Sequence, residues 1–194
     1  MRKATINRKT TETAITANFS LDGQGNAQVD TGIGFFDHML TVMTKYGLID
    51  LTLSCDGDLE VDQHHSVEDT GIVLGQAFKE ALGDKSGITR YASVTTPMDE
   101  ALSFISVDIS GRPYLVYHVD GLKDKVGTFD TELAAEFFRG FINHAGVTLH
   151  INLAYGSNSH HIIESIFKGF GRALGHAASL NDRIDGIPST KGSL

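Results

Sequence analysis

The sequence contains a single cysteine, Cys55, among 194 residues. One cysteine cannot form a disulfide within the chain, and it cannot supply a Cys-based metal site. Cys55 lies in an apolar, strand-like segment, so we expect it to belong to the core rather than to act as a nucleophile. Any metal ion in this protein would therefore have to be held by imidazole and carboxylate groups.

Long apolar runs and blocks of like charge are also missing. No apolar stretch approaches the roughly 18 residues of a membrane-spanning helix, and the basic first ten residues lack the apolar segment of a signal peptide. We therefore expect a cytoplasmic protein. The chain has 16 basic and 24 acidic residues and a net charge of -8, which argues against non-specific nucleic-acid binding. Any anion site must be local.

The sequence does contain two copies of one five-residue motif. Residues 64–68 (HHSVE) and 160–164 (HHIIE) both read His-His-x-x-Glu. On a helix, a glutamate at this spacing lies beside both histidines. Adjacent histidines point about 100° apart at 3.6 residues per turn, so they do not easily bind the same ion. The pair of motifs therefore predicts a site for two metal ions.

The motif is the best preserved part of a longer internal repeat. In each half, a helix-like run with a Phe-Phe pair precedes an apolar strand, a glycine turn and the motif helix. The expected strands cover 51–55 and 147–153, and the expected motif helices cover 65–82 and 161–178. Earlier strands are expected at 4–7, 13–20, 27–29, 90–96, 100–109 and 114–119, with a hairpin turn at 22–26 and a break at Pro97.

This order predicts an α+β fold made of tandem-duplicated βαβα-type halves. The turn-rich segment 83–87 separates a first repeat half, 1–88, from a second half, 89–194, which ends in a loop-like tail. The length suits one large domain or two small fused halves. Because the predicted helices are apolar on more than one side, we expect two sheets sandwiching a four-helix layer.

The repeat also pairs the candidate ligands. A fourth pair, His38 and Glu136, is implied because each adjoins a Phe-Phe pair upstream of its motif. The eight candidate metal ligands are His38, His64, His65, Glu68, Glu136, His160, His161 and Glu164. One symmetric grouping puts His38, His65, Glu68 and His160 on one ion and His64, Glu136, His161 and Glu164 on the other, and neighbouring subunits could share these sets. The mixed nitrogen and oxygen ligands suit manganese, iron, cobalt or zinc.

The other histidines belong to no such constellation. His118, His144, His150 and His176 are therefore expected to have structural roles.

Five segments together resemble the imidazoleglycerol-phosphate dehydratase family. They are residues 37–40 (DHML), 64–69 (HHSVED), 110–114 (SGRPY), 159–164 (SHHIIE) and 188–192 (PSTKG). The resemblance implies dehydration of imidazole glycerol phosphate to imidazole acetol phosphate in histidine biosynthesis, with two manganese ions per site. It also implies a shell of twenty-four subunits built from trimers, with active sites where subunits meet. Several members carry a histidine where this chain has Glu136, but glutamate also suits manganese.

The resemblance begins near the first residue. We therefore expect a chain without the phosphatase domain that precedes the dehydratase in bifunctional members of the family.

The expected chemistry is demanding because the hydrogen removed lies on a carbon of the chain attached to the imidazole rather than beside a carbonyl. Two ions on the ring nitrogens would stabilise an imidazolate intermediate while hydroxide departs. Glu164 is the candidate for moving the carbon-bound proton, and Glu12 resembles the family's acid near the leaving hydroxyl. The candidate phosphate-binding residues are Arg90, Arg112, Lys168, Ser189 and Lys191.

Two other functions remain open from the residues alone. A dinuclear metallohydrolase acting on a phosphate ester would also use two ions flanked by basic residues. A metal-storing or structural shell protein would need the His and Glu clusters but no cations beside them.

Overall fold

The computed structural model describes residues 1–194 and contains two halves with similar element order. The first half comprises β1 (Lys3–Lys9), β2 (Thr13–Ser20), β3 (Ala27–Asp30), α1 (Gly34–Gly47), β4 (Asp50–Gly57) and α2 (His64–Leu82). The second half comprises β5 (Tyr91–Met98), β6 (Ala101–Asp108), β7 (Tyr114–His118), β8 (Lys125–Val126), β9 (Phe129–Asp130), α3 (Leu133–Ala145), β10 (Thr148–Tyr155) and α4 (Ser159–Ala178).

The two large sheets have the same topology. Their strand orders are β1-β2-β4-β3 and β5-β6-β10-β7. In each sheet the first three strands pair antiparallel, and the last strand, β3 or β7, lies parallel to its neighbour. The second half differs by a short β8–β9 hairpin inserted before α3. The predicted α+β fold with duplicated halves is confirmed.

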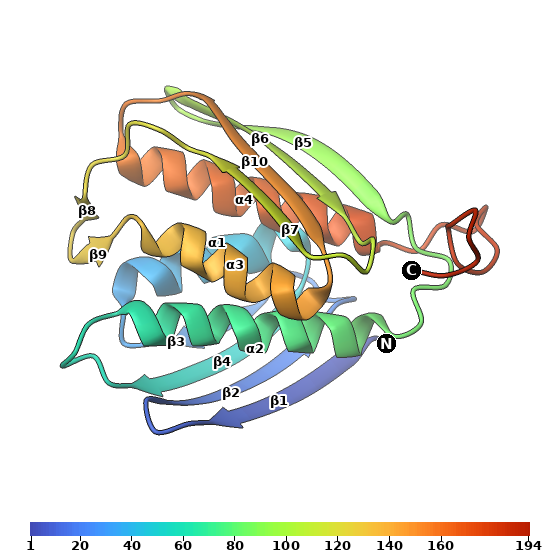
Figure 1. Ribbon diagram of the computed structural model, residues 1–194, viewed down its shortest axis with the longest axis horizontal. Coiled ribbons are helices and arrows are strands. Elements are labelled where there is room, and N and C mark those ends of the chain that lie inside the picture. Colours follow the sequence, from blue (N-terminus) through green and yellow to red (C-terminus); the bar gives the residue numbers. More distant parts are fainter.

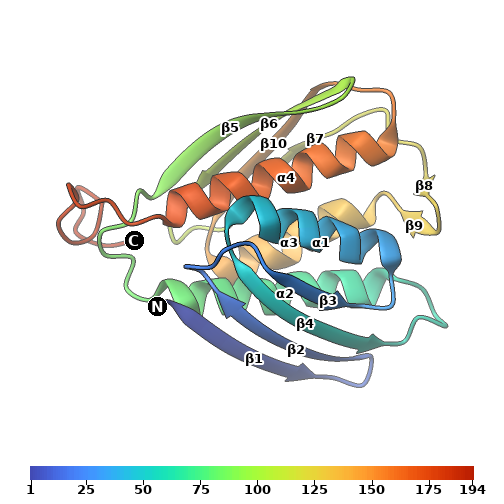
Figure 2. The ribbon, with the colours of Figure 1, turned by 180° about the vertical axis from the view of Figure 1, so that it is seen from behind.

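The helices lie between the two sheets (Figure 1, Figure 2). Helices α1 and α2 cover the first sheet, and α3 and α4 cover the second. Across the middle, α2 packs against α3 and α1 packs against α4, so each half contacts the other through both of its helices. This confirms the predicted helix layer between two sheets. No helix is both long enough and apolar enough to cross a membrane.

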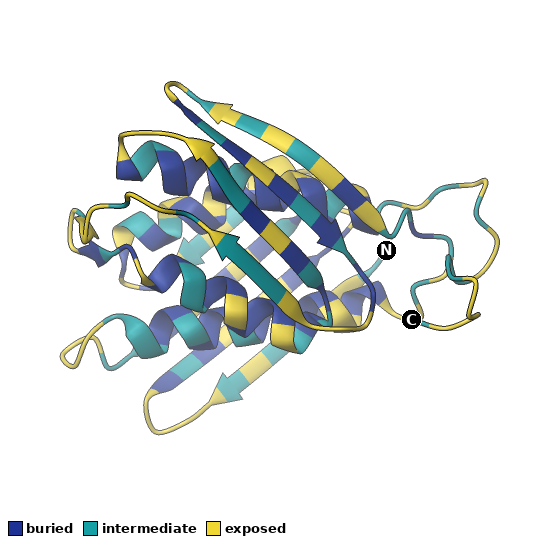
Figure 3. Cartoon of the chain, turned by 45° about the horizontal axis from the view of Figure 1, so that its top comes forward, coloured by how far each residue is buried: buried dark blue, intermediate teal, exposed yellow.

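The hydrophobic pattern explains this arrangement. Strand residues alternate between a buried face toward the helices and an exposed outer face (Figure 3), as expected for sheets covered on one side. The helices are buried on several sides because each packs on a sheet and on another helix. In α4, for example, Ile163, Phe167 and Phe170 are all fully buried. Cys55 is also buried, as expected, and burial raises the pKa of its thiol.

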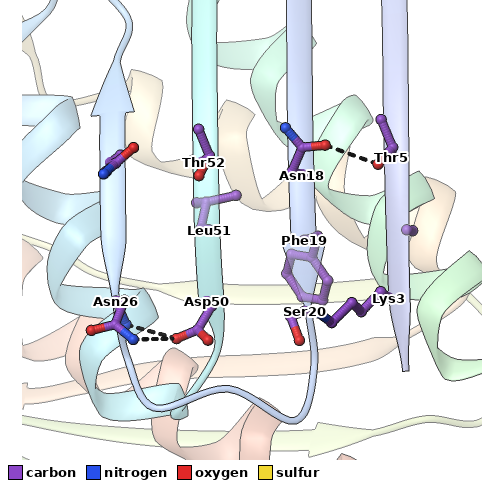
Figure 4. Close-up of a pocket in the computed structure, with 11 residues that line it drawn as sticks. Lys3, Thr5, Asn18, Phe19, Ser20, Asn26, Asp50, Leu51 and Thr52 are labelled. Atoms are coloured by element: carbon purple, nitrogen blue, oxygen red, sulfur yellow. Dashed lines mark hydrogen bonds between the residues drawn. The ribbon is translucent and has the colours of Figure 1, made fainter. Parts of the chain in front are cut away.

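The segment 22–26 does not form the predicted hairpin, because β3 pairs with β4 in parallel and not with β2. Asp50, at the start of β4, holds the segment instead. Its Oδ1 accepts hydrogen bonds from the backbone N–H groups of Gln24 and Asn26, both at 2.9 Å, and from the Asn26 side chain at 3.1 Å (Figure 4). The loop therefore crosses the end of β4, so that β3 pairs with the edge of β4 that faces away from β2.

Pro97 does not end its strand, contrary to expectation, since β5 continues to Met98. Proline cannot donate a backbone hydrogen bond, which excludes it from the middle of a sheet. The position is tolerated here because β5 is an edge strand with β6 as its only neighbour.

Glycines allow the helices of the two halves to pack very closely. A Cβ atom on Gly171 of α4 would lie 2.1 Å from the Met43 carbonyl oxygen of α1, and one on Gly175 would lie 2.3 Å from the Gly47 carbonyl oxygen. At the other crossing, a Cβ atom on Gly71 of α2 would lie 2.4 Å from the Phe137 carbonyl oxygen of α3. Both helix pairs therefore pack backbone against backbone.

Replacing Gly171 with alanine should force α1 and α4 apart. We expect Gly171→Ala to lower the free energy of unfolding by about 1–3 kcal/mol, the range for overpacked interiors, as measured by chemical denaturation. Gly34→Ala is the matched control, because a Cβ atom at this helical glycine would meet nothing within 4 Å. Equal stability of the two variants would contradict the close packing described here.

Candidate metal centre

The predicted ligands lie at one end of the molecule. All four helices begin at this end (Figure 1), and all eight ligands fall in their first two turns. Helix α1 carries His38, α2 carries His64, His65 and Glu68, α3 carries Glu136, and α4 carries His160, His161 and Glu164. The repeat therefore brings residues that are distant in sequence to one end of the fold.

Three of these residues form a compact cluster. Glu164 Oε2 lies 3.4 Å from His38 Nε2 and 3.1 Å from His160 Nε2. One ligand atom from each of the three residues lies within 4.8 Å of the others, a spacing that suits a single ion. The cluster joins the two halves of the repeat, since His38 comes from α1 and the other two come from α4.

Lys168 keeps the carboxyl group of this cluster charged. Its Nζ atom lies 2.7 Å from Glu164 Oε1, one helical turn along α4. Partial burial is the largest single influence and raises the pKa of Glu164, but the hydrogen bond and charge of Lys168, together with the smaller contributions of His38 and His160, outweigh it. The pKa of Glu164 therefore lies below its usual value. Lys168 itself is fixed by Met98, whose Sδ lies 3.1 Å from Nζ, and by the Tyr46 ring, 5.6 Å from Nζ.

The corresponding set of the other helix pair is less complete. His64 Nε2 lies 3.5 Å from Glu68 Oε2, matching the contact between His160 and Glu164. Glu136, the counterpart of His38, pairs instead with Arg139 on its own helix. A single chain therefore assembles one three-residue cluster and one two-residue pair.

The second histidine of the first motif faces carboxylates from outside its helix. His65 Nδ1 lies 3.0 Å from Asp58 Oδ2, and its Nε2 lies 3.8 Å from Glu12 Oε1. The hydrogen bond to Asp58 raises the pKa of His65.

The second motif repeats this arrangement. His161 Nδ1 lies 2.7 Å from Glu100 Oε2, and its Nε2 lies 3.8 Å from Asp99 Oδ2. The hydrogen bond to Glu100 raises the pKa of His161. Hydrogen bonds from His161 and from the backbone N–H of Asn158 lower the pKa of Glu100 to about 2.

The structure groups the ligands differently from the symmetric grouping expected from the sequence. That grouping placed Glu164 with His64, Glu136 and His161, whereas Glu164 lies with His38 and His160. Neither expected set of four is assembled within one chain. The available donors are imidazole nitrogens and carboxylate oxygens, a set that fits manganese and similar transition metals.

Most of the predicted phosphate-binding residues lie elsewhere. Arg90 donates to Asp108 at 2.9 Å and to the Pro188 carbonyl oxygen at 2.9 Å, which ties it to the C-terminal tail that carries Ser189 and Lys191. Arg112 is at the same end, because the adjacent Gly111 packs against the terminal Leu194.

These two groups of residues stand at opposite ends of the chain. The tail follows the C-terminus of α4, whereas the metal ligands occupy its first turns (Figure 1). A helix of 20 residues spans about 30 Å. Within one chain, Lys168 is therefore the only predicted phosphate-binding residue beside the metal ligands.

Of two hollows on the protein surface, one lies beside the candidate metal ligands and the other lies away from them. A hollow of about 450 Å³ lies over the outer face of the first sheet (Figure 4), but it contains none of the predicted site residues. A smaller hollow of about 360 Å³ is bordered by His160, Lys123 and Lys125. The smaller one adjoins the metal cluster and is the better candidate for admitting an anionic ligand.

Comparison with known proteins identifies the family. The family model for imidazoleglycerol-phosphate dehydratase matches residues 31–174, a range that contains all eight predicted metal ligands. The chain belongs to the imidazoleglycerol-phosphate dehydratase family. The resemblance inferred from the five sequence motifs is thereby confirmed.

Individual members of the dehydratase family match along almost the whole chain. The imidazoleglycerol-phosphate dehydratase of Oceanobacillus iheyensis is 68% identical over 194 residues and is covered completely, as is this chain. The dehydratase of Pelobacter propionicus is 57% identical over 193 residues, covering 100% of this chain and 99% of that protein.

Solved structures of the dehydratase family share the fold. The crystal structure of the Staphylococcus aureus enzyme has a TM-score of 0.82 and 43% identity, covering 92% of this chain and 99% of that one. The Pyrococcus furiosus enzyme, in complex with (S)-C348, has a TM-score of 0.85 and 38% identity, covering 97% of this chain and 100% of that one.

Sequence reasoning missed three carboxylates of this dehydratase-family site, namely Asp58, Asp99 and Glu100. The internal repeat offered a signal for two of them. The β5–β6 turn that carries Asp99 and Glu100 is the counterpart of the β1–β2 turn that carries Glu12. Asp58 lies in the connection between β4 and α2, and it has no matching carboxylate contact from the corresponding connection of the other half.

The three-residue cluster predicts which histidines control ion binding. His38→Ala and His160→Ala should each weaken Mn²⁺ binding by more than about tenfold, since even removal of a residue that only supports a ligand costs this much. Isothermal titration of the metal-depleted protein measures the change. His150→Ala, an exposed position in β10, should bind like the parent. Unchanged binding in both cluster variants would contradict the assignment.

Proposed function

We propose that this chain dehydrates imidazole glycerol phosphate to imidazole acetol phosphate, a step of histidine biosynthesis, using two manganese ions per active site. The proposal is supported most directly by the cluster of His38, His160 and Glu164 beside Lys168. These residues lie in the range matched by the dehydratase family model, and full-length relatives carry the same enzyme name.

The eight side chains at the helix N-termini would hold the ions. The donor set of imidazole and carboxylate suits manganese, and the lowered pKa of Glu164 keeps that ligand ionised at neutral pH. Bound divalent ions would act as Lewis acids that withdraw charge from the substrate's imidazole ring.

The remaining steps fall to acid and base groups of the chain. Glu164 accepts the proton from the middle carbon of the glycerol chain, which becomes the ketone carbon, and Lys168 holds the carboxylate in the charged form that this step requires. Glu12 lies near His65 and donates a proton to the departing hydroxyl. Loss of one C–H and one C–O bond releases water and leaves an enol, which rearranges to the ketone product.

Phosphate binding requires a second chain in this proposal. Arg90, Arg112, Ser189 and Lys191 lie about 30 Å from the metal ligands of their own chain, judged from the length of α4. A neighbouring subunit that presents its tail to this end would complete the site beside Lys168. We therefore propose active sites between subunits, in a shell of twenty-four chains built from trimers.

The activity itself is directly testable. Adding imidazole glycerol phosphate and Mn²⁺ should produce imidazole acetol phosphate, detected by its ultraviolet absorbance, and a chelator should abolish the signal. Release of inorganic phosphate instead would indicate a metallohydrolase. Absence of both products would indicate a metal-storing protein.

Replacing the proposed base should separate chemistry from assembly. Glu164→Gln should lower kcat by at least about 10²-fold, the lower limit expected for loss of a general base. Sedimentation should show the same assembly as the parent, with a mass of twenty-four chains. Glu80→Gln, a matched change at the exposed C-terminal end of α2, should leave both measurements unchanged. Near-normal turnover of Glu164→Gln would remove Glu164 from the mechanism.

A further inference from the structure

The second imidazole of each motif is held by a carboxylate from outside its own helix. His65 Nδ1 lies 3.0 Å from Asp58 Oδ2, and His161 Nδ1 lies 2.7 Å from Glu100 Oε2. A neutral imidazole that donates its Nδ1 hydrogen has an unprotonated Nε2 with a free lone pair. Both contacts therefore favour the tautomer in which Nε2 is available to a metal ion.

We propose that Asp58 and Glu100 are positioning residues that fix His65 and His161 in the orientation and tautomer needed to bind the ions through Nε2. The proposal rests on the metal-dependent function proposed above. Metal-binding histidines generally need such an outer hydrogen bond, and its loss typically weakens metal binding about 10–100-fold. The two carboxylates come from different places in the repeat, so the halves achieve one arrangement in two ways.

Asp58 presents both of its oxygens to the imidazole. Oδ1 and Oδ2 lie 3.1 Å and 3.0 Å from His65 Nδ1. The backbone at Asp58 is held in place as well, because its N–H group donates to the Glu12 carbonyl oxygen at 3.1 Å. Because either oxygen can accept the imidazole hydrogen, an asparagine at this position could still turn its oxygen toward His65.

Glu100 divides its oxygens between two tasks. Oε2 faces His161 Nδ1, whereas Oε1 accepts the backbone N–H groups of Asn158 at 2.7 Å and Ser157 at 3.2 Å. These donors lie just before α4, so Glu100 also anchors the start of that helix.

A glutamine at position 100 could not perform both tasks. Its single oxygen would stay with the backbone N–H groups, and its NH₂ group would face His161 Nδ1. The imidazole would then accept at Nδ1 and carry its hydrogen on Nε2, which blocks the ligating atom. The same carboxyl-to-amide change should therefore be mild at Asp58 and severe at Glu100.

Equilibrium dialysis of Mn²⁺ against the assembled protein tests this difference. Asp58→Ala should weaken the binding of one of the two ions per chain about 10–100-fold. Asp58→Asn should cost less than about fivefold, because a neutral hydrogen bond replaces a charge-assisted one. Glu100→Gln should weaken the binding of the other ion about 10–100-fold. The control Glu60→Ala, an exposed carboxylate in the same connection as Asp58, should bind like the parent.

Three outcomes would overturn the proposal: Asp58→Ala binding like Glu60→Ala, Asp58→Asn losing as much affinity as Asp58→Ala, or folded Glu100→Gln binding like the parent. If Glu100→Gln loses its fold, as judged by circular dichroism, the two Asp58 variants decide. Parent protein that binds no Mn²⁺ also overturns it. Parent protein that binds two ions but makes no product refutes the dehydratase function alone, since dialysis measures binding independently of turnover.

Discussion

The cluster of candidate metal ligands His38, His160 and Glu164 depends on the close contact between α1 and α4. His38 comes from the first half of the chain, and Glu164 comes from the second. Their contact is possible because Gly171 and Gly175 let the backbone of α4 approach α1 without an intervening side chain. A larger residue at either glycine would push the two helices apart and lengthen the 3.4 Å contact between His38 and Glu164. The glycines at the crossing of α1 and α4 thus allow polar residues in the first turns of the same two helices to meet.

The second constraint is the direction of the helices. All four begin at one end, which concentrates the ligands there, whereas the tail lies at the other end (Figure 2). Arg90 and Arg112 lie with the tail. Within a single chain the packed helices and sheets lie between these two ends and keep them apart. Helix N-termini favour negative charge, which suits the three glutamates among the candidate ligands and an anionic substrate. The oligomer proposed above, in which the two unlike ends of neighbouring chains meet, would resolve the separation.

Much of the fold was predictable because the repeat constrains it. Alternating strands, apolar helices and the duplicated motif sufficed for the two sheets and the helix layer. The direction of β3 was not predictable, because the segment 22–26 has hairpin composition and its path depends on Asp50, which lies more than twenty residues away. The same limit applies to the ligands. Spacing places Glu164 beside His160, but only the crossing of α1 with α4 adds His38.

The carboxylates around His65 and His161 show how a duplicated site diverges. The contact to each Nδ1 is preserved, although the residue that provides it is Asp58 in one half and Glu100 in the other. Because Glu100 also anchors the start of α4, its position is tied to folding as well as to the imidazole. Asp58 lies in the connection between β4 and α2, and its side chain hydrogen-bonds to His65 alone. The two halves therefore tolerate substitution of this carboxylate unequally. The repeat retains the contact to Nδ1, but it does not retain the residue that makes the contact at a matched position.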